Sequence, residues 1–118
     1  MRREDEGAGH RHARLERLIL QELRTLLRED VADPALVEVR ITTLVLSVDY
    51  RHARIHFVVR GDMHNSAQER VRVERALGRA MPYLRAQLAI AIEMKRVPEL
   101  RFAFDGMVPV DDKEEPCE

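Results

Sequence analysis

The stretch from residue 68 to residue 105 constrains the fold of this chain more than any other. Its apolar residues recur at steps of three, four or one, which keeps them on one face of a long helix. These residues are Val73, Ala76, Leu77, Ala80, Leu84, Leu88 and Ala91. A chain of 118 residues has room for one domain and one core, so we expect this helix to cover that core.

Pro82 lies inside this helical pattern. Proline has no backbone N–H for the bond to the fourth residue before it, and its ring clashes with the carbonyl of that residue. We therefore predict that the helix kinks or breaks near residues 77–81 and continues as a second helix. The predicted interhelical kink consists of Ala80, Met81 and Pro82.

The residues before this stretch predict one helix and a β-hairpin. Residues 11–29 place leucine and isoleucine on one stripe, and Asp33-Pro34 ends this helix because the residue before proline is disfavoured in helical space. Residues 36–48 and 53–60 are rich in β-branched side chains and flank the polar turn 49–52, which indicates a hairpin. The side chains of the first helix that we expect to face water are Glu16, Arg17, Gln21, Arg24 and Arg28.

A third strand follows the long helix, because Leu100, Phe102 and Phe104 alternate with Arg101 and Ala103. The predicted order is helix, strand, strand, helix, kink, helix, strand. Three strands packed under two long helices form a two-layer α+β domain.

The charge is unevenly distributed along the chain. The formal net charge of −1 gives no global indication of nucleic-acid binding. Residues 71–97 are mostly basic, however, and residues 105–118 are mostly acidic. We expect residues 1–9 to be a disordered N-terminus, residues 10–105 to form the folded domain and residues 106–118 to form an acidic flexible tail.

Catalytic motifs are missing from the sequence, which has no glycine-rich phosphate loop and no nucleophile motif. His52 and His56 point the same way on a strand but stand ~13 Å apart along it, too far to chelate one metal ion. His10 and His12 are interpreted in the same way, as surface histidines. The sequence therefore predicts no enzyme, no metal and no cofactor.

The single cysteine, Cys117, has no partner for an internal disulfide, so a reducing cytoplasm is the expected compartment. No apolar run approaches the ~20 residues that span a bilayer, and residues 1–9 lack the apolar segment of a signal peptide. We expect no membrane partner and no small-molecule substrate.

Arginines mark the other face of the long helix. Arg72, Arg75 and Arg79 recur at steps of three and four, a spacing that is by itself more typical of a solvated helix face. Arg85 and Arg96 lie three turns apart on the second half of the helix, with Lys95 beside them, and form a second basic row. A concave elbow that brings the two rows together would gather guanidinium groups and backbone amides suited to phosphate. The predicted RNA-binding residues are Arg72, Arg75, Arg79, Arg85, Lys95 and Arg96.

Three short motifs follow one another in the chain. Asp33-Pro34-x-Leu36 comes after the first helix, and Val45-x-Ser47-x-Asp49-x-x-x-Ala53-x-Ile55 crosses the hairpin. Leu84-Arg85-x-x-Leu88 precedes Met-Lys-Arg-Val-Pro-Glu-Leu-Arg-Phe-x-Phe-Asp at residues 94–105. In this order and spacing they resemble the bacterial ribosome-binding factor A family, over residues 15–105.

The resemblance implies a type II KH-like fold and a non-catalytic, monomeric maturation factor. It implies binding to 16S rRNA on the free small ribosomal subunit (30S), support of late rRNA 5′-end processing, and support of growth in the cold. The family carries an alanine at its interhelical kink, and Ala80 occupies that place here. Where the family often has a small residue two positions later, this chain has Pro82.

Three functional hypotheses follow from the sequence. The first is an rRNA-binding assembly factor that acts by occupancy, through arginine contacts to phosphates. The second is a protein-interaction module that docks an acidic partner on the arginine-rich helix. The third is an enzyme, for which scattered histidines are the only support.

Overall fold

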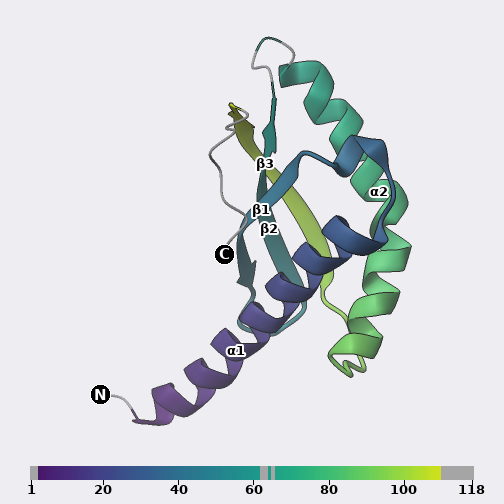
Figure 1. Ribbon diagram of the computed structural model, residues 1–118. Helices are drawn as coiled ribbons and strands as arrows, with labels where there is room; N and C mark the ends of the chain where they lie inside the picture. Colours follow the sequence, from purple (N-terminus) through teal and green to yellow (C-terminus); the bar gives the residue numbers. More distant parts are fainter. Residues whose placement is uncertain (1–2, 62–63, 65, 110–118) are drawn as a thin grey trace.

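The computed structural model describes residues 3–61, 64 and 66–109 of the chain, and side chains from His10 onward (Figure 1). Two long helices lie on one face of a three-stranded sheet, which confirms the predicted two-layer α+β architecture. The elements are α1 (Arg3–Thr25), a π-helical turn η1 (Leu26–Asp30), a 3₁₀ turn η2 (Pro34–Leu36), β1 (Val39–Leu46), β2 (His52–Arg60), α2 (Ser66–Ala91) and β3 (Glu99–Val108).

The sheet has the order β1-β2-β3. β1 and β2 form the predicted antiparallel hairpin, whereas β2 and β3 are parallel, with His52 opposite Glu99. Parallel neighbours need a crossover connection, and α2 provides it. A shift of register between Ile41 and Thr43 interrupts the β1–β2 pairing.

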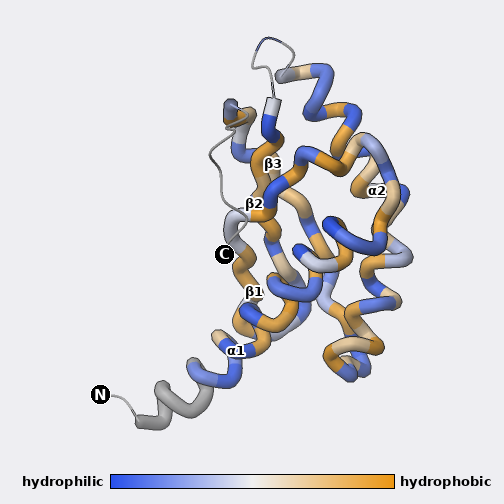
Figure 2. Tube along the Cα trace, viewed as in Figure 1, coloured by the Kyte–Doolittle hydropathy of each residue, from blue (hydrophilic) through white to orange (hydrophobic). Residues whose placement is uncertain are grey.

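The core lies between the sheet and the helices. α1 contributes Ile19 and Leu23, and α2 contributes the predicted apolar stripe from Val73 to Leu88, in which Ala80 is half-buried. Ala91 is exposed, so the prediction that it continues this stripe is wrong. Phe57 of β2 is fully buried, and the centroid of its ring lies 6.2 Å from that of Phe102 and 5.7 Å from that of Phe104. Figure 2 shows apolar residues along the strands and alternating polar and apolar residues along the helices, as amphipathic elements on one core require.

Two polar side chains of α1 bond the backbone of the edge strand β1. Nε and Nη2 of Arg24 donate to the carbonyl oxygen of Ile41, at 3.1 and 2.7 Å, next to the register shift. The Glu16 carboxylate accepts from the Leu46 N–H at 2.8 Å. Glu16 is half-buried, so the prediction that it faces water is wrong, whereas Arg24 is exposed as predicted and bonds the strand as well. Both side chains satisfy backbone groups of an otherwise open sheet edge.

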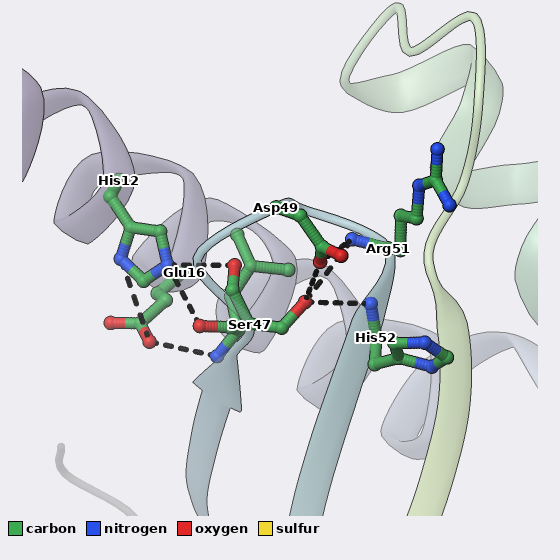
Figure 3. A network of polar contacts seen from close by, with 7 residues as sticks. His12, Glu16, Ser47, Asp49, Arg51 and His52 are labelled. Carbon is green, nitrogen blue, oxygen red and sulfur yellow. Dashed lines mark hydrogen bonds and ion pairs between the residues drawn. The ribbon is translucent and has the colours of Figure 1, made fainter.

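A network of hydrogen bonds closes the hairpin turn (Figure 3). Oγ of Ser47 donates to Oδ1 of Asp49 at 2.7 Å and accepts the backbone N–H groups of Arg51 and His52 at 3.2 and 3.0 Å. The Ser47 hydroxyl and the Arg51 N–H lower the pKa of Asp49, since both stabilise its charged form. Tyr50 takes the left-handed backbone conformation that completes the turn, at φ +65°.

His12 connects α1 to the same hairpin. Its Nε2 lies 2.7 Å from the carbonyl oxygen of Leu46 and 3.1 Å from that of Ser47 (Figure 3). The centroid of its ring lies 5.4 Å from that of Tyr50. The side chain is 25% exposed. The interpretation of His12 as a plain surface histidine is therefore wrong, because the folded chain uses it to satisfy turn carbonyls.

α2 runs without interruption through Pro82, so the predicted division into two helices at Ala80-Met81-Pro82 is wrong. The proline and Gly78, whose carbonyl loses its helical donor, both lie on the exposed side, where water can bond that carbonyl. Leu77 and Leu84 on the opposite side are buried and hold both halves of the helix against the same core. Packing therefore maintains one helix across the missing hydrogen bond.

Two elements of the structure extend past the predicted boundaries of the folded domain. α1 begins at Arg3, within the segment 1–9 for which we predict disorder. β3 continues to Val108 beside β2 and buries Met107, beyond the predicted boundary at residue 105. The disorder of the N-terminus and the flexibility of the acidic tail stay predictions. Residues 110–118, with Cys117 and most of the acidic tail, lie outside the described residues.

Candidate nucleic-acid interface

The N-terminal half of α2 carries three exposed arginines. Arg72 Nη1 lies 3.4 Å from an oxygen of Glu69, and Arg79 Nη2 lies 3.0 Å from Oδ2 of Asp33. The Arg75 side chain is exposed and has no hydrogen bond or ion pair with any residue that the structure describes. The three guanidinium groups therefore lie where a bound molecule can reach them.

The partners of Arg72 and Arg79 do not remove them from solvent. The Arg72 side chain is 52% exposed and that of Arg79 is 63% exposed. Exposed ion pairs contribute little net stability, because water screens the attraction and holding two long side chains costs entropy. Either arginine can exchange its carboxylate partner for a phosphate group. Two oxygens of a phosphate accept from the guanidinium fork in the same way as the two oxygens of a carboxylate.

A groove of about 660 Å³ lies between η2 and this half of α2. Its apolar lining comes from short side chains on both elements, and arginines of α2 flank it. The lining residues are Asp33, Pro34, Ala35, Ala67, Gln68, Val71, Arg72, Arg75 and Arg79. The predicted arginine row thus borders a groove that α2 forms with η2, and the sequence pattern did not indicate this partner element.

Asp33 holds the two walls of this groove together. Its Oδ1 accepts the Ala35 N–H at 3.0 Å as a cap of η2, and its Oδ2 accepts from Arg79. The Ala35 N–H and then the Arg79 guanidinium lower the pKa of Asp33. We predicted only a helix end at Asp33-Pro34, although aspartate directly before proline is also a known capping signal.

Arg85 differs from the three arginines of the groove in its burial and in its contacts. It is half-buried, and its Nη2 donates to the carbonyl oxygen of Val97 at 3.2 Å. This bond ties the second half of α2 to the segment that leads into β3. Arg85 therefore has a structural contact, and its contact with RNA stays a prediction.

Lys95 and Arg96 lie in the turn after α2 and not on a second half-helix, so the predicted second basic row on the helix is wrong. The helix ends at Ala91, where Glu93 takes φ +57° and the Met94 N–H donates to the Ala89 carbonyl at 3.0 Å. This left-handed cap redirects the chain before the basic pair. Both side chains are exposed, and their contact with RNA stays a prediction.

Two of the three predicted kink residues pack against the core, and the residue after them, Tyr83, bonds the end of the first helix. Ala80 and Met81 are half-buried against the core, and Pro82 is exposed. The Tyr83 hydroxyl donates to Oδ2 of Asp30 in η1 at 3.1 Å. Partial burial and the Asp30 carboxylate raise the pKa of Tyr83, so the hydroxyl stays a donor.

The strand histidines contact acidic side chains of β3. Nδ1 of His52 lies 3.2 Å from Glu99, and Nδ1 of His56 lies 3.2 Å from Asp105. Within residues 3–61, 64 and 66–109, no group of three histidine, cysteine or acidic side chains is arranged to hold a metal ion. In the same residues, no helix is both long and apolar enough to cross a membrane.

The sequence matches the ribosome-binding factor A family over residues 11–113. The ribosome-binding factor A of Heliobacterium modesticaldum is 41% identical over 98 residues, which are 83% of this chain and 78% of that protein. The ribosome-binding factor A of Lactobacillus acidophilus is 34% identical over 88% of this chain and 84% of that protein.

A crystal structure and a fitted homology model share the fold of this chain at similar sequence identity. The crystal structure of ribosome-binding factor A from Thermus thermophilus superposes with a TM-score of 0.67 at 27% identity, over 79% of this chain and 93% of that one. A homology model of the Thermus thermophilus factor, fitted into a cryo-EM map of its complex with the 30S subunit, gives a TM-score of 0.54 at 26% identity, over 80% and 90%.

A solution structure of a Thermotoga maritima protein, a putative ribosome binding factor A, has the same fold, with a TM-score of 0.56 at 23% identity over 89% of this chain and 92% of that one. These likenesses confirm the KH-like fold that the sequence motifs implied. With the family match over nearly the whole chain, the conclusion is plain: this chain belongs to the ribosome-binding factor A family.

Proposed function

We propose that this protein binds the free small ribosomal subunit late in its assembly, contacts 16S rRNA and supports processing of the rRNA 5′ end without catalysing it. Family membership supports the ribosomal target, and the Thermus thermophilus relative has been fitted into a map of a 30S complex. The observation that carries the proposal is the exposed arginine face of α2, on Arg72, Arg75 and Arg79.

The mechanism is occupancy. Arginine forks pair with phosphate oxygens, and each pair releases counterions from the RNA, so affinity comes mainly from the backbone and depends on salt. Phosphate contacts position a protein on RNA without reading bases. A protein held in this way keeps an immature RNA conformation from being used too early, and no covalent step is needed. In this proposal the protein acts as a monomer in the cytoplasm and supports growth in the cold.

Sedimentation of cell extract on a sucrose gradient tests this function. The protein is expected to comigrate with free small subunits and to be absent from complete ribosomes. Comigration with complete ribosomes alone, or with neither particle, would overturn the proposal.

Nuclease treatment before the gradient distinguishes RNA from protein as the contact. The RNA contact predicts that the protein moves to the top of the gradient once the rRNA is digested. If it remains with a protein complex, the alternative of an acidic protein partner docked on α2 holds instead.

A further inference from the structure

We propose that the groove between η2 and α2 binds the base of one unpaired RNA nucleotide, while the arginines along its rim hold the flanking phosphates. This inference rests on the proposed function and names the RNA feature that the same site would recognise. An unpaired base is the part of an RNA that can leave its own stack and enter a protein groove.

The floor of the groove suits a planar apolar ring. Pro34 and Ala35 line it from η2, and Ala67 and Val71 line it from the first turns of α2. Val71 is 47% exposed, so part of its side chain is open to a ring placed in the groove. The volume, about 660 Å³, lies within the range of about 300–1,000 Å³ that small-molecule sites occupy.

The rim of the groove suits phosphate and base together. Ala67, Val71, Arg75 and Arg79 follow one another at steps of four, so the apolar floor passes directly into the basic rim along one helical row. An arginine side chain can pair with a phosphate through its fork and stack its guanidinium plane on a base. This stacking replaces the aromatic platforms that many RNA-binding proteins use, since no aromatic side chain lines the groove among the residues that the structure describes.

The alternation of positive charge and apolar surface favours RNA over an acidic peptide as the occupant. Both acidic side chains near the rim, Asp33 and Glu69, are already bonded to arginines, so the surface presents positive charge along one line. RNA has a phosphate on each side of every nucleoside, so negative charges alternate with planar rings along the strand. The groove has the matching alternation, because its apolar floor is flanked by arginines. A peptide would have to place acidic and apolar side chains in the same alternation.

A pair of oligonucleotides separates base binding from phosphate binding. The full chain is titrated with hexauridylate and with an abasic hexamer of the same length and charge. The base-bearing hexamer is expected to bind roughly tenfold more tightly, since a stacked base contributes about that much. Amide signals of Ala35 and Val71 in NMR spectra are expected to shift with hexauridylate and not with the abasic strand. Equal affinities for the two strands would overturn the proposal.

A variant that fills the groove gives the second test. Ala67→Leu adds an apolar side chain to the floor at an exposed helical position, where leucine is a good helix former. Ala86→Leu, on the exposed face of the second half of α2, is the matched control. Ala67→Leu is expected to lose most of the advantage for hexauridylate and to keep the affinity for the abasic strand, whereas Ala86→Leu changes neither.

Failure of this proposal is distinguishable from failure of the proposed function. If wild-type and Ala67→Leu proteins bind hexauridylate equally while the protein still comigrates with small subunits, only the base-binding inference is wrong. If a glutamate-rich peptide binds the wild type more tightly than hexauridylate and Ala67→Leu abolishes that binding, the groove is a peptide site and the inference is also overturned.

Discussion

Ser47 shows how a single hydroxyl can fix a turn. It bonds one carboxylate and two backbone N–H groups in the hairpin, and these bonds hold the end of β1 against the start of β2. Ser47→Ala leaves the two N–H groups without this acceptor. We expect a loss of about 1 kcal/mol in the free energy of unfolding, measured by urea denaturation. An unchanged midpoint would show that water replaces the hydroxyl at no cost.

The same variant has a consequence for the pKa of Asp49. Hydrogen bonds to its charged form lower this pKa in the folded protein below its ordinary value of 3.8. A carboxylate with a lowered pKa contributes stability that is present above the unfolded value and is lost as pH falls through the folded value.

In Ser47→Ala we therefore expect the pKa of Asp49 to rise toward 3.8, and the stability of the variant to fall less steeply in acid below that pH. NMR titration of the carboxyl carbon measures this shift. Asp33, which has other donors, stays low in the same experiment and is the internal control. A pKa of Asp49 that does not move would show that the Arg51 N–H alone sets it.

Arg85 and Arg75 lie on the same helix, but of these two only Arg85 has a contact within the described part of the chain that stabilises the fold. Arg85→Ala removes a bond to the Val97 carbonyl and a half-buried stem, so we expect a loss of about 1–2 kcal/mol in stability. Arg75→Ala removes the same charge from a side chain with no hydrogen bond or ion pair among the described residues, so the melting temperature stays within about 1 °C. Calorimetry of the two variants checks the difference. Equal melting temperatures would contradict the structural contact of Arg85.

For single residues, the sequence predicted which side chains share a helix face but not which partners they bond. The spacing of Arg72, Arg75 and Arg79 predicted their shared helix face correctly, because helical periodicity depends only on local geometry. Their partners could not be predicted, since Asp33 reaches Arg79 only when η2 packs beside α2. The contacts of His12 and Arg24 were missed for the same reason, as both bond to carbonyls distant in sequence.

At the scale of elements, α2 shows packing prevailing over local preference. Pro82 favours a break, yet the buried residues on both sides of it keep one helix. Pro82→Ala restores a helical hydrogen bond and removes a ring clash, which raises the free energy of unfolding by about 3 kcal/mol. The unfolded chain also becomes more flexible without the proline, which lowers the free energy of unfolding by about 1 kcal/mol.

We therefore expect Pro82→Ala to stabilise the protein by about 1–2 kcal/mol in urea denaturation. A variant that is equally or less stable than the wild type would indicate that the proline is already compatible with the local backbone, and that the restriction of the unfolded chain outweighs the gain.

Element ends were harder to predict than elements. The alternation of Leu100, Phe102 and Phe104 identified β3, but its continuation to Val108 depends on pairing with β2, which no local pattern contains. The end of α2 was placed too late for a similar reason. The basic and apolar residues up to Arg96 continue the helical pattern, whereas the left-handed backbone at Glu93 ends it.

For the whole molecule, the order of elements was enough to predict two layers. A hairpin followed by a long helix and a further strand leaves few ways to cover one sheet, and the structure has both helices on the same face. The groove could not be predicted, because it forms between η2 and α2, which only the completed fold brings together. The exposed arginine face that it borders is what connects this fold to the proposed RNA contact.

The salt dependence of binding to purified small subunits tests this account most directly. Each phosphate contact adds about 0.7–0.9 to the slope of log affinity against log salt concentration. The triple variant Arg72→Ala, Arg75→Ala, Arg79→Ala is therefore expected to bind more weakly and to lose roughly two to three units of slope. The matched triple of exposed α1 arginines, Arg11→Ala, Arg14→Ala and Arg17→Ala, is expected to keep the wild-type slope. An α2 triple variant with wild-type affinity and slope would contradict the arginine face as the site of contact.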